Sequence, residues 1–178
     1  MPLVSPPEGS NLTPAQLALA EALVAAELGL PDLAEQAGVG ESGEIGSSGL
    51  IALSRPAVSI QSLVVAGAPV IGVLTNPRTI DVSATIRPAL TGGLLGTNYA
   101  PLPYLVSYTA GWAAGTLPEG IRQAVLLTAQ AGAAAAGRVG IKSESMGPVS
   151  RSYTDAASTG TLPADARALL RPWLPTRF

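Results

Sequence analysis

The sequence contains no cysteine and no histidine. Without cysteine there is no disulfide, no thiolate nucleophile and no cysteine-ligated zinc. Without histidine, a serine nucleophile lacks its usual general base. A serine–lysine pair would need Lys142, the only lysine, which precedes Ser143 in a segment with no surrounding signature. These absences exclude most nucleophilic and zinc-dependent enzyme classes and leave carboxylates as the candidates for catalysis.

Charged residues are scarce, at 12% of 178 residues, compared with about 25% in an ordinary soluble domain. The mean hydropathy is +0.37. This length predicts one compact domain with an insertion, and few charges are available to cover its surface. We therefore expect part of the surface to be buried in other subunits. The net charge of −2 and the scattered basic residues do not indicate a nucleic-acid platform.

Two long stretches, residues 56–77 and 88–118, carry no charge at all. Glycines and prolines interrupt both, so neither is expected to form a membrane-spanning helix. Residues 1–10 lack the basic and apolar regions of a signal peptide. We expect no membrane association.

The charges that are present are segregated along the chain. Residues 1–54 hold seven acidic residues and no basic one, a net charge of −7, whereas residues 55–178 hold ten basic and five acidic residues, a net charge of +5. One interpretation is a solvated acidic helix. The other is that the acidic part of one subunit meets the basic part of the next, as in head-to-tail contacts that close a ring.

A first helix is predicted from Thr13 to about Leu28. Thr13-Pro14-Ala15-Gln16 is a capping box with proline at the first helical position, and Gly29 and Pro31 end the helix. Residues 31–37 are expected to add a short helical turn, and residues 38–49 are interpreted as a Gly/Ser/Glu linker. The GxGxxG match at 38–43 lacks the strand and helix of a dinucleotide site, so we assign it to this linker.

Residues 50–110 predict an inserted antiparallel β-domain. Turn signals at Gly67-Ala68-Pro69 and Asn76-Pro77 separate short apolar runs. Residues 79–86 alternate between apolar and polar side chains, which predicts a half-buried strand. The expected strands are 50–53, 58–65, 70–74, 79–86 and 102–108.

A second helix begins after Leu117-Pro118-Glu119, where proline and an acidic residue suit the first turn. Its end, residues 131–136, is almost entirely alanine and glycine. We expect this small-residue end to be sandwiched between helices, within the subunit or across an interface, although helix propensity alone is an alternative explanation. Residues 140–154 are expected to form a protruding two-stranded loop, and residues 164–171 a third helix.

The fold class is therefore predicted as α+β, with a small helical bundle of the N-terminal, central Ala-rich and C-terminal helices and an inserted antiparallel β-domain. Four units are expected. Residues 1–49 form an N-terminal arm, a helix and a linker, and residues 50–110 form the β-domain. Residues 111–171 form the helical bundle with its loop at 140–154, and residues 172–178 form a docking tail.

The tail has the sequence RPWLPTRF, in which arginine and large aromatic residues lie between prolines. Such rigid residues suit docking into a partner's pocket, and a frayed terminus is the alternative. The docking candidates at this end are Arg167, Arg171, Trp173, Leu174, Arg177 and Phe178.

Several motifs in chain order resemble the head–tail connector (adaptor) proteins of tailed bacteriophages over about residues 50–171. The more specific parts are a Tyr-Thr-Ala-Gly-aromatic turn and a Ser-Glu-Ser-x-Gly loop. The motifs are Arg55-Pro56-x-Val58, Val106-Ser107-Tyr108-Thr109-Ala110-Gly111-Trp112, Leu117-Pro118, Ser143-Glu144-Ser145-Met146-Gly147, Ser150-x-Ser152-Tyr153, and Leu162-Pro163 with Leu169-Leu170.

This resemblance implies a structural virion protein without catalytic residues, cofactor or metal. It implies a homo-oligomeric ring, commonly twelve-fold, that lies beneath the portal protein, extends the DNA channel and carries the tail. Such a protein would be made in the host cytoplasm, bind a tail-side protein, and let double-stranded DNA pass without specific binding. The loop residues expected to face a neighbour or the lumen are Ser143, Glu144, Met146, Arg151 and Tyr153.

Two other functions stay open from the sequence. One is another ring of the neck or tail, such as a stopper or tail-terminator protein. The other is a carboxylate-dependent hydrolase that uses Asp81 or Glu144, although most acidic residues lie on the first helix or in the expected linker.

Overall fold

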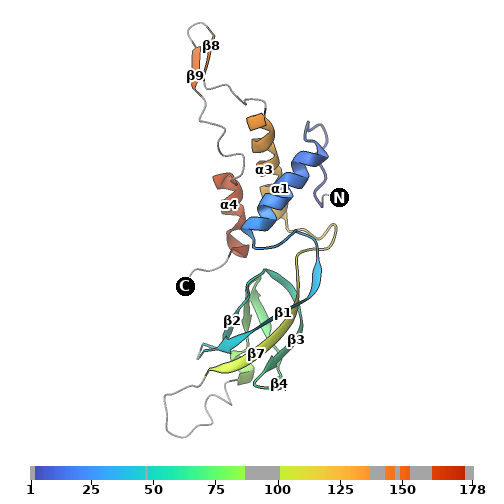
Figure 1. The fold of residues 1–178 in the computed structure, drawn as a ribbon, viewed down its shortest axis with the longest axis vertical. Coiled ribbons are helices and arrows are strands. Elements are labelled where there is room, and N and C mark those ends of the chain that lie inside the picture. The colour runs from blue at the N-terminus through green and yellow to red at the C-terminus, as the bar shows by residue number, and fades with distance from the viewer. Residues whose placement is uncertain are drawn as a thin grey trace.

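The computed structural model describes residues 3–46, 48–86, 101–136, 143–146, 149–152 and 162–174, with side chains left out at 143–152. Helices form one end of the elongated molecule and a β-domain forms the other (Figure 1). This arrangement confirms the predicted α+β class, with antiparallel sheets inserted between helices of one bundle. The elements are α1 Pro14–Glu27, β1 Gln36–Ile45, β2 Leu50–Ala52, β3 Ala57–Val65, β4 Ala68–Pro69, β5 Val73–Asn76, β6 Thr79–Asp81, β7 Leu102–Ala110, α3 Glu119–Ala136, β8 Ser143–Met146, β9 Val149–Ser152, α4 Ala164–Leu170 and the 3-10 helix η1 Arg171–Trp173.

Helix α1 begins as its sequence predicts. The Gln16 amide donates to Thr13 Oγ1 at 3.3 Å, and the Thr13 amide donates to Gln16 Oε1 at 2.8 Å, which completes the capping box. Gly29 has a φ of 65°, a left-handed conformation that ends the helix. Leu17 and Val24 are fully buried and fix the inner face of α1 on the bundle.

Strand β1 corrects the interpretation of residues 38–49 as a linker. It pairs antiparallel with β7 from Gln36↔Ala110 to Ile45↔Leu102. The short helical turn expected at 31–37 is also wrong, because Asp32 Oδ1 accepts from the Ala34 amide at 2.9 Å and directs the chain into β1. Most side chains of β1 are not buried, so its sequence carries no hydrophobic pattern. Backbone hydrogen bonds to β7 keep these residues in the strand.

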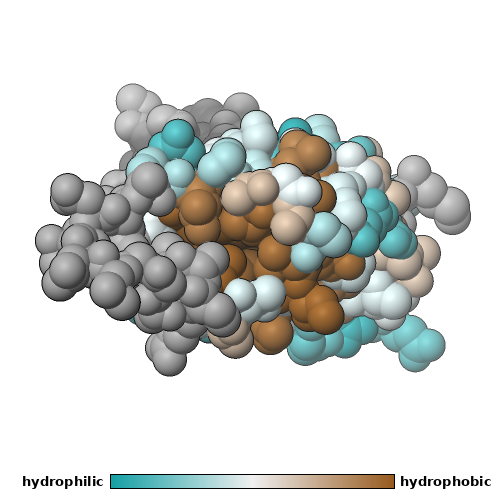
Figure 2. Space-filling model, turned by 90° about the horizontal axis from the view of Figure 1, so that it is seen from below, coloured by the Kyte–Doolittle hydropathy of each residue, from teal (hydrophilic) through white to brown (hydrophobic). Residues whose placement is uncertain are grey.

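Strand β7 is central in the larger sheet, whose strand order is β1-β7-β3-β4, and the smaller sheet has the order β2-β6-β5. The predicted strands at 50–53, 58–65 and 102–108 are confirmed within one or two residues. Figure 2 views the molecule from the β-domain end, where apolar side chains gather near the centre of the face. The exposed large apolar residues of this domain are Leu50, Val58, Ile71, Val73 and Leu105.

The strand predicted at 79–86 is wrong beyond Asp81, because residues 83–86 are helical. Asp81 Oδ1 accepts from the Ser83 amide at 2.8 Å, and the Val82 carbonyl accepts from the amides of Thr85 and Ile86. Val82 and Ile86 are both buried, since they are four residues apart and share one face of a helical turn. The strand predicted at 70–74 is wrong over residues 70–72, which belong to no strand, and β5 begins only at Val73.

Helix α3 begins one residue after Pro118, whose carbonyl accepts from the Ile121 amide at 3.0 Å. Its first half is buried at Ile121, Ala124 and Val125. In contrast, most of the small-residue end, 131–136, is exposed within the subunit. No helix in the described ranges is both long and apolar enough to cross a membrane.

Candidate docking and assembly surfaces

The C-terminal docking candidates differ in burial and in the partners they already have within the subunit. Leu170, between them, is fully buried and anchors α4 on the bundle. The Trp173 ring packs on Gly120, where a Cβ atom would lie only 3.2 Å from it. Arg167 donates to Glu27 Oε1 at 2.7 Å, an exposed ion pair between α4 and α1. Arg171 is exposed.

Leu174 is partly buried, and Arg177 and Phe178 lie outside the described residues. The structure thus brings α4, η1 and α3 together at the base of the bundle. It directs Trp173 into the subunit. The exposed docking candidates in the described part of this segment are therefore its arginines, of which Arg167 is paired with Glu27.

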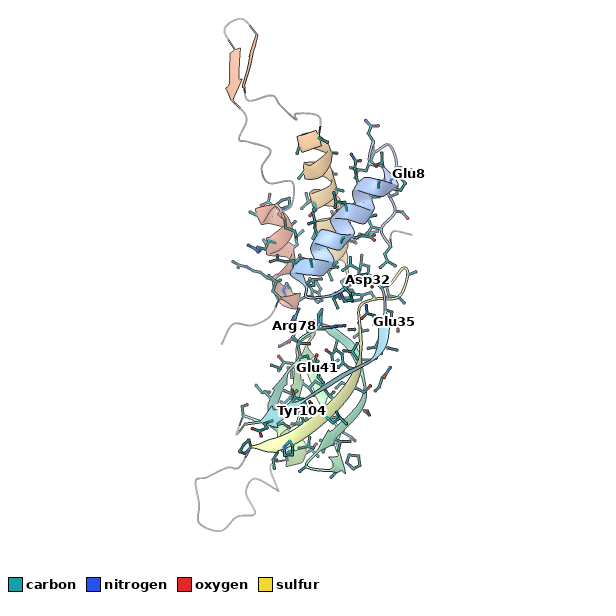
Figure 3. The ribbon with its side chains drawn as sticks, in the orientation of Figure 1. Glu8, Asp32, Glu35, Glu41, Arg78 and Tyr104 are labelled. Atoms are coloured by element: carbon teal, nitrogen blue, oxygen red, sulfur yellow. The ribbon has the colours of Figure 1, made fainter. Side chains whose placement is uncertain are left out.

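Arg78 joins this segment to the rest of the molecule, a role that its sequence context did not indicate. Its side chain is only 5% exposed and lies between the bundle and the β-domain (Figure 3). Nη2 donates to the Leu28 carbonyl at 2.6 Å, Nη1 to the Ser54 carbonyl and Nε to the Trp173 carbonyl. Burial lowers the pKa of the guanidinium, and the nearby Tyr108 and Glu41 partly oppose that shift. The only local signal was the Asn76-Pro77 turn before it.

A second polar cluster lies beside Arg78 in the β-domain. Glu41 of β1 accepts hydrogen bonds from the Tyr108 hydroxyl, from the Ser54 hydroxyl and from the Ser54 amide at 3.1 Å. Tyr108 is fully buried, so its hydroxyl needs this acceptor. The Glu41 carboxylate is thereby engaged in a structural role, crossing from β1 to β7 and to the Ser54 loop.

We expect this cluster to make stability fall at high pH. Burial, followed by the hydrogen bond to Glu41, raises the pKa of Tyr108 from 10.0 to about 12. Because the folded-state pKa is the higher one, the contribution is complete below pH 10 and is lost as the pH rises through 12. Urea unfolding of wild type and Tyr108→Phe between pH 9 and 12 tests this. The difference in free energy of unfolding should shrink over that window, and a constant difference would contradict the assignment.

The two residues considered as alternatives for hydrolysis lie in different elements. Asp81 accepts from the Ser83 amide and ends β6. Glu144 lies in β8 opposite Arg151 of β9, where only the backbone is described. Across the described ranges, no group of three acidic side chains could hold a metal ion.

The hairpin β8–β9 contains four of the five loop candidates. Its register pairs Ser143 with Ser152, Glu144 with Arg151 and Met146 with Val149. This pairing agrees with the two-stranded loop predicted at 140–154. Tyr153 lies outside the described residues. Such a short two-stranded hairpin is marginally stable alone and has unpaired backbone groups on both edges.

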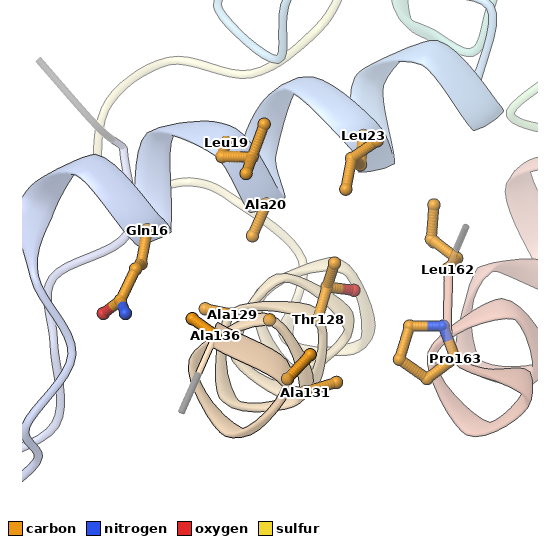
Figure 4. A pocket seen from close by; sticks show the side chains of 12 residues that line it. Gln16, Leu19, Ala20, Leu23, Thr128, Ala129, Ala131, Ala136, Leu162 and Pro163 are labelled. Carbon is orange, nitrogen blue, oxygen red and sulfur yellow. The ribbon is translucent and has the colours of Figure 1, made fainter. Parts of the chain in front are cut away.

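A groove lies between α1, the second half of α3 and residues 162–163 (Figure 4). It has a volume of about 580 Å³ and no charged residue in its lining. Leu19 of α1, at its edge, is 59% exposed. We call it the bundle groove, and its lining residues are Gln16, Leu19, Ala20, Leu23, Thr128, Ala129, Ala131, Gly132, Ala135, Ala136, Leu162 and Pro163.

The two flanks of the bundle differ in charge. Glu8, Asp32 and Glu35 are exposed and lie on the flank opposite α4 (Figure 3). Helix α4 and η1 expose Arg167 and Arg171 on the other flank. Glu27, which pairs with Arg167, and the exposed Asp165 of α4 also lie on this second flank, so the two signs of charge are separated only in part.

Comparisons with known proteins found a likeness among solved structures and none among family models or curated proteins. No protein-family model matches the chain, and the curated proteins contain no match. Among solved structures, the chain is similar to one described as "Neck of empty GTA particle computed with C6 symmetry", with 18% identity and a TM-score of 0.39, over 92% of this chain and 77% of the other.

Proposed function

We propose that this protein is a structural subunit of a phage-type neck, a head–tail adaptor that forms a ring beneath the portal protein. The ring would extend the DNA channel and provide the platform on which the tail assembles. The observation that carries this proposal is the bundle groove, an uncharged surface lined by the small-residue end of α3 and left open in a chain with few charges. The motifs from Val106 to Trp112 and from Ser143 to Gly147 add the resemblance to adaptor proteins.

A second copy of this chain is the proposed occupant of the groove. The acidic flank, with Glu8, Asp32 and Glu35, would face the arginines of α4 and η1 between neighbours in a head-to-tail ring. Heterologous contacts of this kind close into a ring when the rotation between copies allows it. Each exposed ion pair contributes little energy, so the charges would set orientation and the apolar groove would supply affinity.

The C-terminal segment is proposed to bind the portal protein, through Arg171 and the residues after Leu174. The hairpin β8–β9 is proposed to contact a neighbouring copy or to face the channel. DNA would pass without specific binding, since few basic groups are available to hold phosphates. A stopper or tail-terminator ring is the second candidate, and hydrolysis through Asp81 or Glu144 is a remote third.

The mass of the intact assembly, measured alone and after mixing with a portal ring, tests this function. We expect a closed ring of identical copies, of about twelve by the family resemblance, and a further complex with the portal. A ring that binds a tail-side component and not the portal would favour the stopper or tail-terminator role. A stable monomer at high concentration that binds no neck component would overturn the proposal.

Removing residues 175–178 is expected to weaken portal binding at least tenfold without changing the mass of the ring. The deletion stops short of Trp173 because that side chain packs on Gly120, and its loss would disturb the bundle. Binding to an immobilised portal ring measures the effect. Arg122→Ala, an exposed arginine on α3, is the control. Unchanged portal binding by the shortened chain would reject the tail assignment.

A further inference from the structure

The guanidinium of Arg78 makes an unusual set of bonds for a buried cation. Its three hydrogen bonds all go to backbone carbonyl oxygens, and these belong to segments 50, 24 and 95 residues away in the sequence. A buried charge is costly unless it is neutralised and hydrogen-bonded. The groups that compensate the positive charge of Arg78 therefore indicate which parts of the fold this residue connects.

Two of the three carbonyls lie at the ends of helices. Leu28 is the C-cap of α1, and Trp173 is the last residue of η1, which continues α4. Carbonyl groups at a helix C-terminus carry partial negative charge and favour a cation. Arg78 thus brings two helix ends together at one cationic centre. The third carbonyl, of Ser54, belongs to the β-domain and ties the same centre to the Glu41–Tyr108 cluster.

The turn that carries Arg78 is itself rigid. The Arg78 amide donates to Asn76 Oδ1 at 2.8 Å, and the Arg78 carbonyl accepts from the Leu53 amide at 2.8 Å. The Pro77 carbonyl accepts from the Ala57 amide at 2.6 Å. The guanidinium is therefore presented from a backbone held by hydrogen bonds. Its donors are spread over three nitrogens in a planar fork, whereas the three donors of a lysine ammonium share one nitrogen.

We propose that Arg78 is the positioning residue of the C-terminal segment, residues 162–174. It fixes the end of that segment against α1 and the β-domain, so the exit point of the last residues is set by the β-domain turn. Its relevance to assembly rests on the proposed function, in which these last residues dock on the portal. In that case the β-domain determines where on the ring each docking tail emerges.

The test is hydrogen exchange by mass spectrometry on wild type, Arg78→Met and Arg78→Lys, with no portal present. Methionine keeps much of the apolar bulk and removes the donors. We expect the amides of residues 164–174 to exchange about tenfold faster or more in Arg78→Met, because bonds from a charged donor are lost. Amides in the core of α3, residues 121–129, should change less than threefold. Arg78→Lys should give an intermediate, equally local effect.

Arg122→Met is the matched control, since Arg122 is exposed and its partner Glu119 lies on the same helix. It should leave both regions at wild-type rates. Equal acceleration of the two regions in Arg78→Met would indicate a general loss of stability and overturn the positioning role, as would unchanged rates. If Arg78→Met does not fold, the same comparison is made with Arg78→Lys: faster exchange in residues 164–174 than in 121–129 supports the positioning role, and equal or unchanged exchange overturns it.

Portal binding is measured separately on the same variants. Selective loosening of 164–174 together with weaker portal binding supports both proposals. Selective loosening in a protein whose wild type binds no portal keeps the positioning role and removes the proposed portal docking.

Discussion

Replacing Gly111 by alanine is expected to destabilise the folded protein by about 3 kcal/mol or more. Gly111 follows β7 with a φ of 75°, a left-handed conformation that costs other residues about 1–2 kcal/mol. A Cβ atom there would also lie 2.8 Å from the Ala34 carbonyl carbon and closer still to its oxygen. The neighbouring bond from the Trp112 amide to the Leu33 carbonyl, at 3.0 Å, would have to give way. This crossing joins the start of β1 to the end of β7.

Gly115→Ala is the matched control for that substitution. Gly115 has a φ of 83°, but no atom lies within 4 Å of its missing Cβ. It should therefore show the conformational cost alone, about 1–2 kcal/mol. In thermal unfolding we expect the midpoint of Gly111→Ala to fall by about 6–12 °C and that of Gly115→Ala by about half as much or less. Equal losses would mean that the approach to Ala34 contributes nothing.

Replacing Ala131 by arginine is expected to abolish ring assembly while leaving the subunit folded. Ala131 is exposed in the subunit and lines the bundle groove. An exposed surface substitution should change the stability of the subunit by less than about 0.5 kcal/mol. If a neighbouring copy covers the groove, the same arginine would be buried there without a partner, and the affinity between copies should fall about a hundredfold or more.

Ala134→Arg provides the comparison on the same helix. Ala134 is also exposed but does not line the groove, so the Ala134→Arg protein should assemble as wild type does. Sedimentation of the three proteins at equal concentration gives the distribution of assembled and single subunits. Rings of wild-type mass from Ala131→Arg would show that the groove is not the contact between copies.

Local sequence signals determined most of the regular structure. The capping box at Thr13, the stop at Gly29 and the proline before α3 each act within four or five residues, so the helix limits follow from the sequence alone. Three of the predicted strands could be located because their apolar runs end at glycine and proline turns. The alternation over 79–86 misled the prediction, because a helical turn after Asp81 buries Val82 and Ile86 just as a strand would.

Only the tertiary structure decided the features on which the proposed function depends. Strand β1 has few side chains to bury, and it becomes a strand because β7, some 60 residues later, supplies its hydrogen-bond partners. Arg78 looks like any surface arginine in the sequence, and its role arises from carbonyls contributed by α1, the Ser54 loop and η1. The close neighbour expected at residues 131–136 stays a prediction, and their exposure within the subunit depends on how α1 and α4 pack around α3. Capping and turn preferences act within a few residues, whereas burial and pairing depend on groups that are distant in the sequence and meet only in the folded chain.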